Sequence, residues 1–320
     1  MDTSSIGTPG LWIGFVTLVL CMLALDLGVL NRKDHVVGFR EALGWTGVWV
    51  FLSLGFNAFV WFRFGQQHAI EFLTGYVIEK SLSIDNIFVF VVIFSALRIP
   101  AVYQHRVLYW GILSALVLRA GMILAGAAVL QRFHAVMYLF GAFLIVTGVK
   151  IYIQRNQEEH PEQSLLMRKV RQLIPSSAEL DGHHFVTKQN GRILATPLLM
   201  ALVLVELSDV VFAVDSIPAI FAVTLDPFIV FTSNIFAILG LRSLFFVLAR
   251  LVDKFRYLKL GLAVVLVFVG VKMCIVDFFP ISSLVSLAVI LGVLTIAILA
   301  SLRASAHEHA NARDALASGG

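Results

Sequence analysis

Acidic side chains interrupt two strongly apolar stretches of the sequence. One reads GYVIEKSLSIDNIFVF from Gly75, and the other reads VLVELSDVVFAVDSIPAIFAV from Val203. A charged side chain at the centre of a bilayer costs roughly 2.5 to 3.5 kcal/mol, so each of these acids needs a compensating partner. We expect them to form a cation-binding site. The five acids are Glu79, Asp85, Glu206, Asp209 and Asp215.

Neutral oxygen ligands accompany the acids. Asn86, Ser208 and Ser216 lie in the same two stretches. Carboxylate, amide and hydroxyl oxygens suit magnesium, calcium or manganese, whereas the two cysteines, Cys21 and Cys274, are remote from the acids and argue against zinc or copper. A buried carboxylate cluster can also exchange a metal ion for protons, because burial favours the protonated form and a dication the ionised form. The residues leave the coupling ion open.

Buried basic residues offer the acids an alternative to a metal ion. Lys80, Arg119 and Arg242 lie within apolar stretches and are candidate charge partners. The two arginines lie too deep for their side chains to reach water, so we expect them to pair with some of the acids. If all the acids were paired in this way, the cluster would be purely structural.

Two further residues affect how the acids are presented. Pro218 has no amide to donate to the carbonyl of Val214, so we expect its helix to kink or open near Asp215 and turn that side chain inward. Asp85 and Asp215 are then expected to meet. Asp26, near the end of the first apolar stretch, is a candidate gate, although a capping role suits it better.

The composition places these acids in a membrane protein. Of the 320 residues, 59% are hydrophobic and 14% are charged, with a mean hydropathy of +0.90, too few polar side chains to cover a water-exposed globule. We predict an all-α polytopic protein, one transmembrane domain over residues 1–320, because only helices satisfy their backbone amides in lipid. Nine stretches are long enough to cross: 10–30, 43–62, 72–95, 107–130, 134–153, 195–223, 228–249, 259–276 and 281–302.

Charge distribution predicts the orientation of these spans. Alternate loops on one side hold only Arg63 and Arg132, whereas the other side holds seventeen Lys and Arg residues. Cationic loops stay in the cytoplasm, so we expect the N-terminus outside and the C-terminus inside. The asymmetry explains the net charge of +4 without nucleic-acid binding. Residues 154–194 are then a cytoplasmic loop, and residues 303–320 a disordered cytoplasmic tail.

The sequence also repeats itself. Spans 3 to 5 (72–153) and spans 6 to 8 (195–276) carry three matches in the same order, and an odd number of spans per copy makes the repeat inverted. Many secondary transporters build a site between such copies, although a duplicated bundle with no transport role is the alternative. The matches pair Ile84-Asp85-Asn86-Ile87 with Val214-Asp215-Ser216-Ile217, Leu118-Arg119 with Leu241-Arg242, and Gly148-Val149-Lys150 with Gly270-Val271-Lys272.

These motifs resemble the TerC family, most closely its Alx-like branch, over about residues 10 to 300. The resemblance is carried by EFLTGYVIEKSLSIDNIFVF from Glu71, ATPLLMALVLVELSDVVFAVDSIPAIFAVT from Ala195 and DPFIVFTSNIFAILGLRSLFF from Asp226. It implies a bacterial inner-membrane protein associated with manganese efflux and, in some relatives, with tellurium resistance. By this analogy the five acids line the cation path, with Asn86, Ser208 and Ser216 as neutral ligands.

The leading hypothesis is therefore a secondary transporter that exports a hard divalent cation, Mn²⁺ before Ca²⁺ or Mg²⁺, with protons as a candidate coupling ion. It needs no resident cofactor and no enzymatic activity. One alternative is a non-transporting subunit of a tellurium-resistance or metal-stress complex, with the 154–194 loop as its contact surface. A membrane hydrolase with paired aspartates is a weaker alternative, because no Gly-x-Gly-Asp stretch accompanies Asp85 or Asp215.

Overall fold

The computed structural model describes residues 5–28, 38–133, 135–154, 170, 173–177, 179–189, 191–249 and 257–318. Within these ranges the side chains at 25–28, 85, 131 and 305–318 are left undescribed. Most of the predicted 154–194 loop lies outside the described residues. The part that is described ends in a two-stranded antiparallel hairpin of β1 (Val186–Gln189) and β2 (Arg192–Ala195).

Helices occupy all nine apolar stretches in the described part of the chain. The stretch at 228–249 contains two helices rather than one. The helices are α1 (Pro9–Gly28), α2 (Phe39–Phe64), α3 (Gln66–Ala96), α4 (Ala101–Arg132), α5 (Ala135–Gln154), α7 (Pro197–Phe221), α8 (Pro227–Leu239), α9 (Leu241–Leu248), α10 (Leu258–Cys274) and α11 (Ser283–Ser318).

Length and hydropathy support membrane crossing for part of this set. Among the described helices, α2, α4, α5, α7 and α11 are long and apolar enough to span a bilayer, and α8 with α9 makes a sixth if that bent pair is one span. The protein is thus a predominantly helical, multi-pass membrane protein. The count of nine spans stays a prediction.

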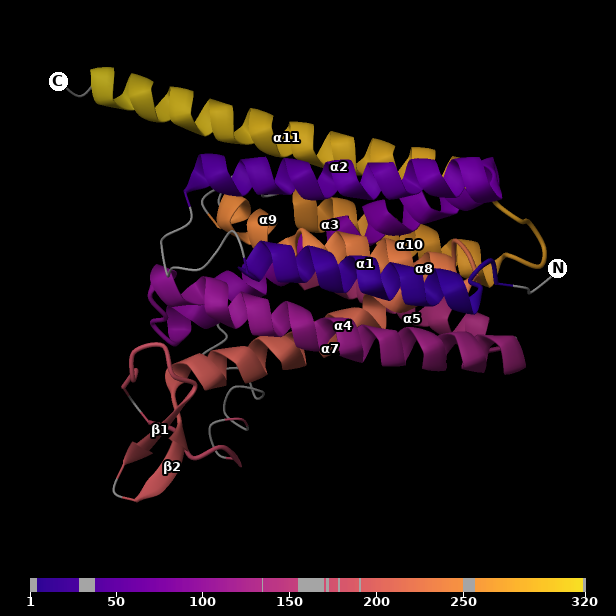
Figure 1. The fold of residues 1–320 in the computed structure, drawn as a ribbon. Helices are drawn as coiled ribbons and strands as arrows, with labels where there is room; N and C mark the ends of the chain where they lie inside the picture. Colours follow the sequence, from indigo (N-terminus) through magenta and orange to yellow (C-terminus); the bar gives the residue numbers. More distant parts are fainter. Residues whose placement is uncertain are drawn as a thin grey trace.

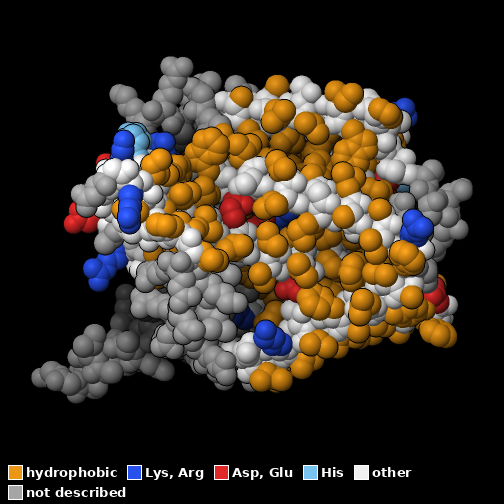
Figure 2. Space-filling view, turned by 90° about the horizontal axis from the view of Figure 1, so that it is seen from below, with side chains coloured by type: hydrophobic (Ala, Val, Ile, Leu, Met, Phe, Trp, Pro, Cys, Tyr) orange, Lys and Arg blue, Asp and Glu red, His pale blue; other side chains and the backbone are white. Residues whose placement is uncertain are grey.

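The helices form a bundle whose members run side by side along its long axis (Figure 1). The chain termini lie at opposite ends of this bundle, and the β1–β2 hairpin projects from the end where the C-terminus lies. Figure 2 shows hydrophobic side chains spread over the middle of one face, with most of the visible Lys and Arg toward its two ends and a few acidic side chains among the hydrophobic ones. An apolar belt between charged ends is the surface that a bilayer-embedded bundle presents.

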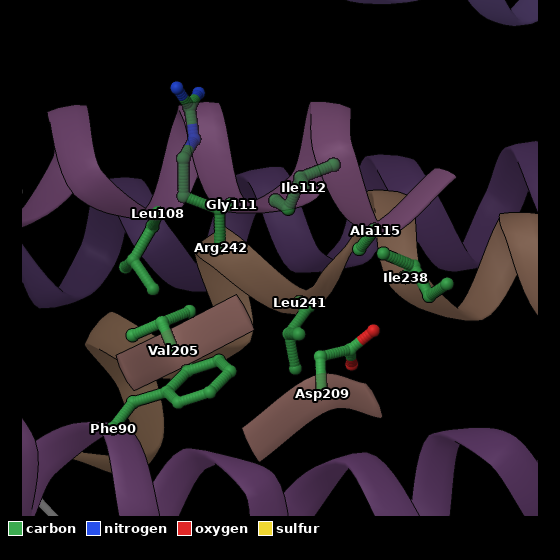
Figure 3. A pocket seen from close by; sticks show the side chains of 10 residues that line it. All are labelled: Phe90, Leu108, Gly111, Ile112, Ala115, Val205, Asp209, Ile238, Leu241 and Arg242. Carbon is green, nitrogen blue, oxygen red and sulfur yellow. The ribbon is translucent and has the colours of Figure 1, made fainter. Parts of the chain in front are cut away.

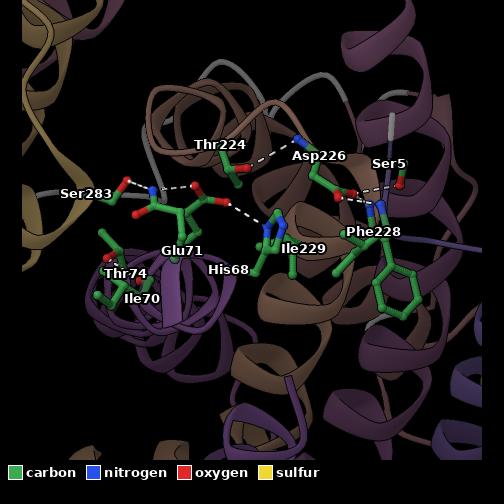
Figure 4. A network of polar contacts seen from close by, with 12 residues as sticks. Ser5, His68, Ile70, Glu71, Thr74, Thr224, Asp226, Phe228, Ile229 and Ser283 are labelled. Atoms are coloured by element: carbon green, nitrogen blue, oxygen red, sulfur yellow. Dashed lines mark hydrogen bonds and ion pairs between the residues drawn. The ribbon is translucent and has the colours of Figure 1, made fainter. Parts of the chain in front are cut away.

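Helix α8 lies at the centre of the core. Every residue from Phe228 to Leu239 is buried, as expected for a helix that is mostly apolar and carries no charged side chain. Asp226 caps its first turn, because its carboxylate accepts a hydrogen bond from the Phe228 amide at 2.8 Å. The same carboxylate accepts from the Ser5 hydroxyl at 2.7 Å and so fixes the N-terminal segment to α8 (Figure 4).

A second polar network lies near the end of the bundle where Asp226 contacts Ser5 (Figure 4). The Gln67 side chain donates to Glu71 at 2.8 Å and to the hydroxyl of Ser283 at 3.3 Å, which links α3 to the start of α11. His68 Nδ1 lies 3.5 Å from the Glu71 carboxylate (Figure 4). These polar groups are therefore used in joining helix ends.

Helices α5 and α10 pack backbone against backbone. A Cβ atom at Gly141 would lie 2.8 Å from the carbonyl oxygen of Gly270, and one at Gly148 would lie 2.8 Å from that of Ala263. Advancing along α5 therefore means retreating along α10, so the two helices cross antiparallel. Only glycine permits so close an approach.

Helix α7 does not open at Pro218, and a helix break lies instead at Gly240. Helix α7 continues through Pro218 to Phe221, whereas α8 and α9 meet at Gly240 with a bend of 43°. Pro218 lies within α7, so the helix accommodates it although the Val214 carbonyl receives no hydrogen bond from its nitrogen. Gly240, by contrast, has no side chain to stabilise a helical turn.

The C-terminal residues also differ from the prediction. Helix α11 runs to Ser318, whereas a disordered tail was expected from residue 303. This part of the sequence has six alanines after residue 303, and alanine has the highest intrinsic helix propensity.

Candidate functional site

A buried arginine joins two of the predicted acids. Arg119 on α4 donates to Asp209 on α7 from Nε at 3.1 Å and from Nη2 at 2.6 Å. Its Nη1 forms an ion pair with Glu79 on α3 and donates to Asn234 Oδ1 at 3.1 Å. Asn234, on α8, returns a hydrogen bond from Nδ2 to Glu79 Oε2 at 3.1 Å. Four helices thus meet at one network.

The four side chains of this network are almost completely shielded from solvent. Arg119 and Glu79 are each 1% exposed, Asp209 is 5% exposed and Asn234 is 0% exposed. All four carboxylate oxygens of the two acids accept a hydrogen bond, and a bidentate guanidinium contact is among the stronger arrangements for a buried pair. One positive charge faces two negative ones, so the network retains a formal charge of −1.

Glu206, three residues before Asp209 on α7, makes its hydrogen bond outside this network. Its Oε1 accepts a hydrogen bond from the Ser114 hydroxyl on α4 at 2.5 Å, while its Oε2 is buried without a hydrogen-bond partner in the described structure. Gly111 leaves space beside it, since a Cβ there would already lie 3.4 Å from Glu206 Oε1. This carboxylate therefore keeps one unused acceptor.

Asp215 is half-buried on α7, where Thr147 Oγ1 of α5 lies 3.4 Å from its Oδ1. Next to it, Ser216 Oγ is buried with no hydrogen-bond partner among the described residues. The same holds on α3 for Asn86 Oδ1 and Ser83 Oγ. Buried polar atoms are rarely unpaired, so these oxygens need an explanation.

The remaining predicted residues have other surroundings. Ser208 donates its hydroxyl to the Leu204 carbonyl at 2.7 Å within its own helix. Lys80 donates to the carbonyl of Ala237 at 3.2 Å, near the α8–α9 break. The Lys80 ammonium is close enough that a Cβ at Gly240 would lie 2.7 Å from its Nζ.

Arg242 and Asp209 line one small pocket. Its wall is otherwise apolar and includes Phe90, Val205 and Leu241 (Figure 3). In this view the guanidinium of Arg242 points away from the Asp209 carboxylate. The two arginines that match in the sequence repeat are thus placed differently with respect to Asp209.

Two predicted residues cannot be placed. Asp85 lies in α3 and Asp26 lies in α1, but their side chains are outside the described part of the structure. The expected meeting of Asp85 with Asp215 stays a prediction. Among the described residues, no three His, Cys, Asp or Glu side chains are arranged to hold a metal ion.

Three participating residues were not predicted from the sequence. Asn234, Ser114 and Thr147 each contact one of the predicted acids. Each is an uncharged polar residue inside an apolar stretch, which was the available signal. Such residues are common in membrane helices, so that signal alone does not identify a site.

The sequence profile of the integral membrane protein TerC family matches residues 64–309, which include every acid described above except Asp26. The chain belongs to the TerC family. The resemblance seen in the sequence motifs is thereby confirmed.

Similar TerC family proteins occur in several bacteria. The membrane protein STKORF319 of Myxococcus xanthus is 66% identical over 311 residues, covering 97% of this chain and 98% of that one. A protein of Escherichia coli that carries the name membrane-bound redox modulator Alx is 49% identical over 300 residues, covering 91% and 94%. A membrane protein of Rickettsia felis is 40% identical over 291 residues, covering 91% and 97%. No solved structure matches the chain.

Proposed function

We propose that this TerC family protein is a secondary transporter that exports a hard divalent cation, chiefly Mn²⁺, from the cytoplasm across the bacterial inner membrane. In this proposal nine spans cross the membrane with the N-terminus outside and the C-terminus inside. The cation is the cargo, and the protein needs neither a resident cofactor nor an enzymatic step. Its partners are lipid, the metal ion and protons.

The packing of α5 on α10 supports an inverted repeat. The repeat pairs Gly148 with Gly270, an offset of 122, and the same offset pairs Gly141 with Ala263. Exchanging the copies therefore converts the Gly148–Ala263 contact into the Gly270–Gly141 contact, and both contacts are present. A twofold relation between the copies accounts for this.

Helices α3 and α7 support the same relation. A Cβ at Gly75 would lie 3.1 Å from Ile220 Cγ2, and Phe90 lines a pocket with Val205. The repeat offset of 130 relates Gly75 to Val205 and Phe90 to Ile220. Exchanging the two copies therefore converts the first pair into the second. In the same antiparallel alignment of α3 and α7, Asn86 on α3 lies at the height of Asp209 on α7. Ser216 on α7 likewise lies at the height of Glu79 on α3.

The observation that carries the proposal is the set of unpartnered oxygens in this region. Asn86 Oδ1 and Ser216 Oγ occupy matching positions in the two copies, are buried, and have no hydrogen-bond partner among the described residues. Each lies level with an acid, so a cation entering between α3 and α7 would find neutral and charged oxygen ligands of the kind that Mn²⁺ accepts.

Exchange with protons follows from the chemistry of the acids. When a dication leaves a buried carboxylate, the carboxylate is stabilised by taking up a proton. Glu206, which has one unpartnered oxygen, and Asp215, which is only half-buried, are the described acids best suited to this role. Export of one metal ion would then be driven by protons moving inward.

The name redox modulator belongs to the relatives. In this chain the two cysteines, Cys21 on α1 and Cys274 on α10, are too far apart in sequence to form a Cys-x-x-Cys pair. Thiol redox chemistry is therefore no part of the proposal.

Purified protein in proteoliposomes tests the proposal. We expect wild-type vesicles to move Mn²⁺ down its gradient and Asp215→Asn vesicles to lose most of that flux, while Asp181→Asn, which alters an exposed loop acid, behaves as wild type. If the wild-type protein moves no Mn²⁺ and binds none, the transporter assignment fails and the non-transporting subunit becomes the better explanation.

A further inference from the structure

Two of the acids expected to bind the cargo already hold a cation of the protein itself. Both oxygens of Asp209 accept hydrogen bonds from Arg119. Of the Glu79 oxygens, one pairs with Arg119 and the other accepts from Asn234. In this arrangement neither acid has an unused oxygen directed at a metal ion.

The arginine also connects the two repeats. Glu79 and Asp209 occupy matching positions on α3 and α7, six residues before Asp85 and Asp215 respectively. A single guanidinium from α4 bridges them. The bridge therefore holds the first helices of the two copies together through charge rather than through apolar packing.

The matching arginine does not share this role. Arg242 corresponds to Arg119 in the sequence repeat, yet its guanidinium points away from Asp209 (Figure 3). Of these two arginines, Arg119 is the one that bridges the two acids. The sequence repeat alone, which matches the two arginines, does not predict this difference.

The guanidinium opposes the approach of a dication to these acids, because like charges repel and its hydrogen bonds already use one acceptor site on three of the four carboxylate oxygens. We propose that Arg119 is a built-in counter-cation: it holds Glu79 and Asp209 when the transporter is empty and is displaced from them when a divalent cation binds. This inference rests on the transport function proposed above and adds a competitor to its site.

The proposal explains why the empty protein keeps two acids buried. Without a cation, two carboxylates in the membrane interior would be unstable. With Arg119 between them the empty site is stabilised, and the metal ion must overcome that stabilisation to bind. Removing the arginine charge should therefore strengthen metal binding while weakening the empty protein.

Mn²⁺ binding to the purified full-length protein tests this directly. Equilibrium dialysis should show Arg119→Gln binding Mn²⁺ about tenfold more tightly than wild type or better, a shift of about 1.4 kcal/mol. Thermal unfolding should show a lowered Tm for this variant without metal and a larger rise in Tm on adding Mn²⁺ than wild type shows. A merely structural arginine would not produce that metal-dependent rescue.

Two further variants keep the test decisive. Lys272→Gln removes another buried cation, one that donates to Ser286 instead of to these acids, and should leave Mn²⁺ affinity unchanged. Arg119→Lys keeps the charge but loses the bidentate contact, so its affinity for Mn²⁺ should lie between those of wild type and Arg119→Gln. It replaces Arg119→Gln in the binding test if that variant does not fold.

The outcomes separate this inference from the proposed function. If wild type binds and transports Mn²⁺ but Arg119→Gln and Arg119→Lys bind no more tightly, the counter-cation role is overturned and transport stands. If wild type neither binds nor transports Mn²⁺, the proposed function fails and this inference fails with it.

Discussion

Arg119 and Asp209 meet through two parallel hydrogen bonds, 3.1 Å and 2.6 Å long, although they lie 90 residues apart in the chain. This contact joins α4 to α7 in a region with almost no solvent exposure. Breaking one partner of such a buried pair typically costs about 3–5 kcal/mol, because the remaining charge is left uncompensated.

The first prediction concerns the coupling of these two residues. Arg119→Gln should lower the free energy of unfolding by about 3–5 kcal/mol, because it leaves Glu79 and Asp209 without a counter-charge. Asp209→Asn should cost less, since Glu79 still balances the arginine. The double variant should be clearly less destabilised than the sum of the two. Unfolding in mild detergent, followed by circular dichroism, measures this, and simple additivity would refute a direct interaction.

The second prediction concerns the glycine contact between α5 and α10. Gly270→Ala should destabilise the protein by about 1–3 kcal/mol, because the new Cβ would lie 2.6 Å from the carbonyl oxygen of Gly141. Gly121→Ala is the matched control, since no atom lies within 4 Å of a Cβ there, and it should be neutral or slightly stabilising. Equal Tm values for the two variants would contradict the close approach.

The third prediction separates binding from stability. Ser216→Ala removes a hydroxyl that has no hydrogen-bond partner among the described residues, so the free energy of unfolding should change little. Its Kd for Mn²⁺ should rise about tenfold if Ser216 is a ligand. Ser95→Ala is the control, because that exposed hydroxyl donates to the Val91 carbonyl near the end of α3, outside the proposed site. Unchanged Mn²⁺ affinity in Ser216→Ala would remove this residue from the site.

The fourth prediction concerns proton coupling. A gradient that is acidic on the side toward which Mn²⁺ moves should accelerate its transport, because protons then move in the opposite direction and take the place of the metal ion at the acids. A protonophore should abolish the acceleration. Mn²⁺ flux in vesicles with imposed pH gradients measures the effect, and a rate independent of the gradient would exclude proton exchange.

Much of the helix arrangement could be predicted from hydropathy, because apolar length alone identifies segments that fit a bilayer. The break at Gly240 could not, since the stretch beyond it is again mostly apolar, with Arg242 and Ser243 as the polar residues of α9. Pro218 carried the stronger local signal, yet α7 continues through it to Phe221.

The sequence could predict the site only as a set of charged residues whose burial in a membrane is energetically unfavourable. The cost of burying charge indicated that Arg119 needed acidic partners, but sequence spacing could not say which acids lie within its reach. Asn234 shows the limit most clearly. It completes the hydrogen bonds of Glu79 and Arg119, yet it is one neutral polar residue in a fully buried helix.

The junction of α5 with α10 is a layer of main chain on main chain, since Gly141, Gly148 and Gly270 contribute no side chain that could rotate to absorb a displacement. A contact this close resists sliding of one helix along the other. We therefore expect rearrangement elsewhere in the bundle to leave this contact intact, so the α5–α10 pair is a suitable fixed reference against which to measure movement of the other helices.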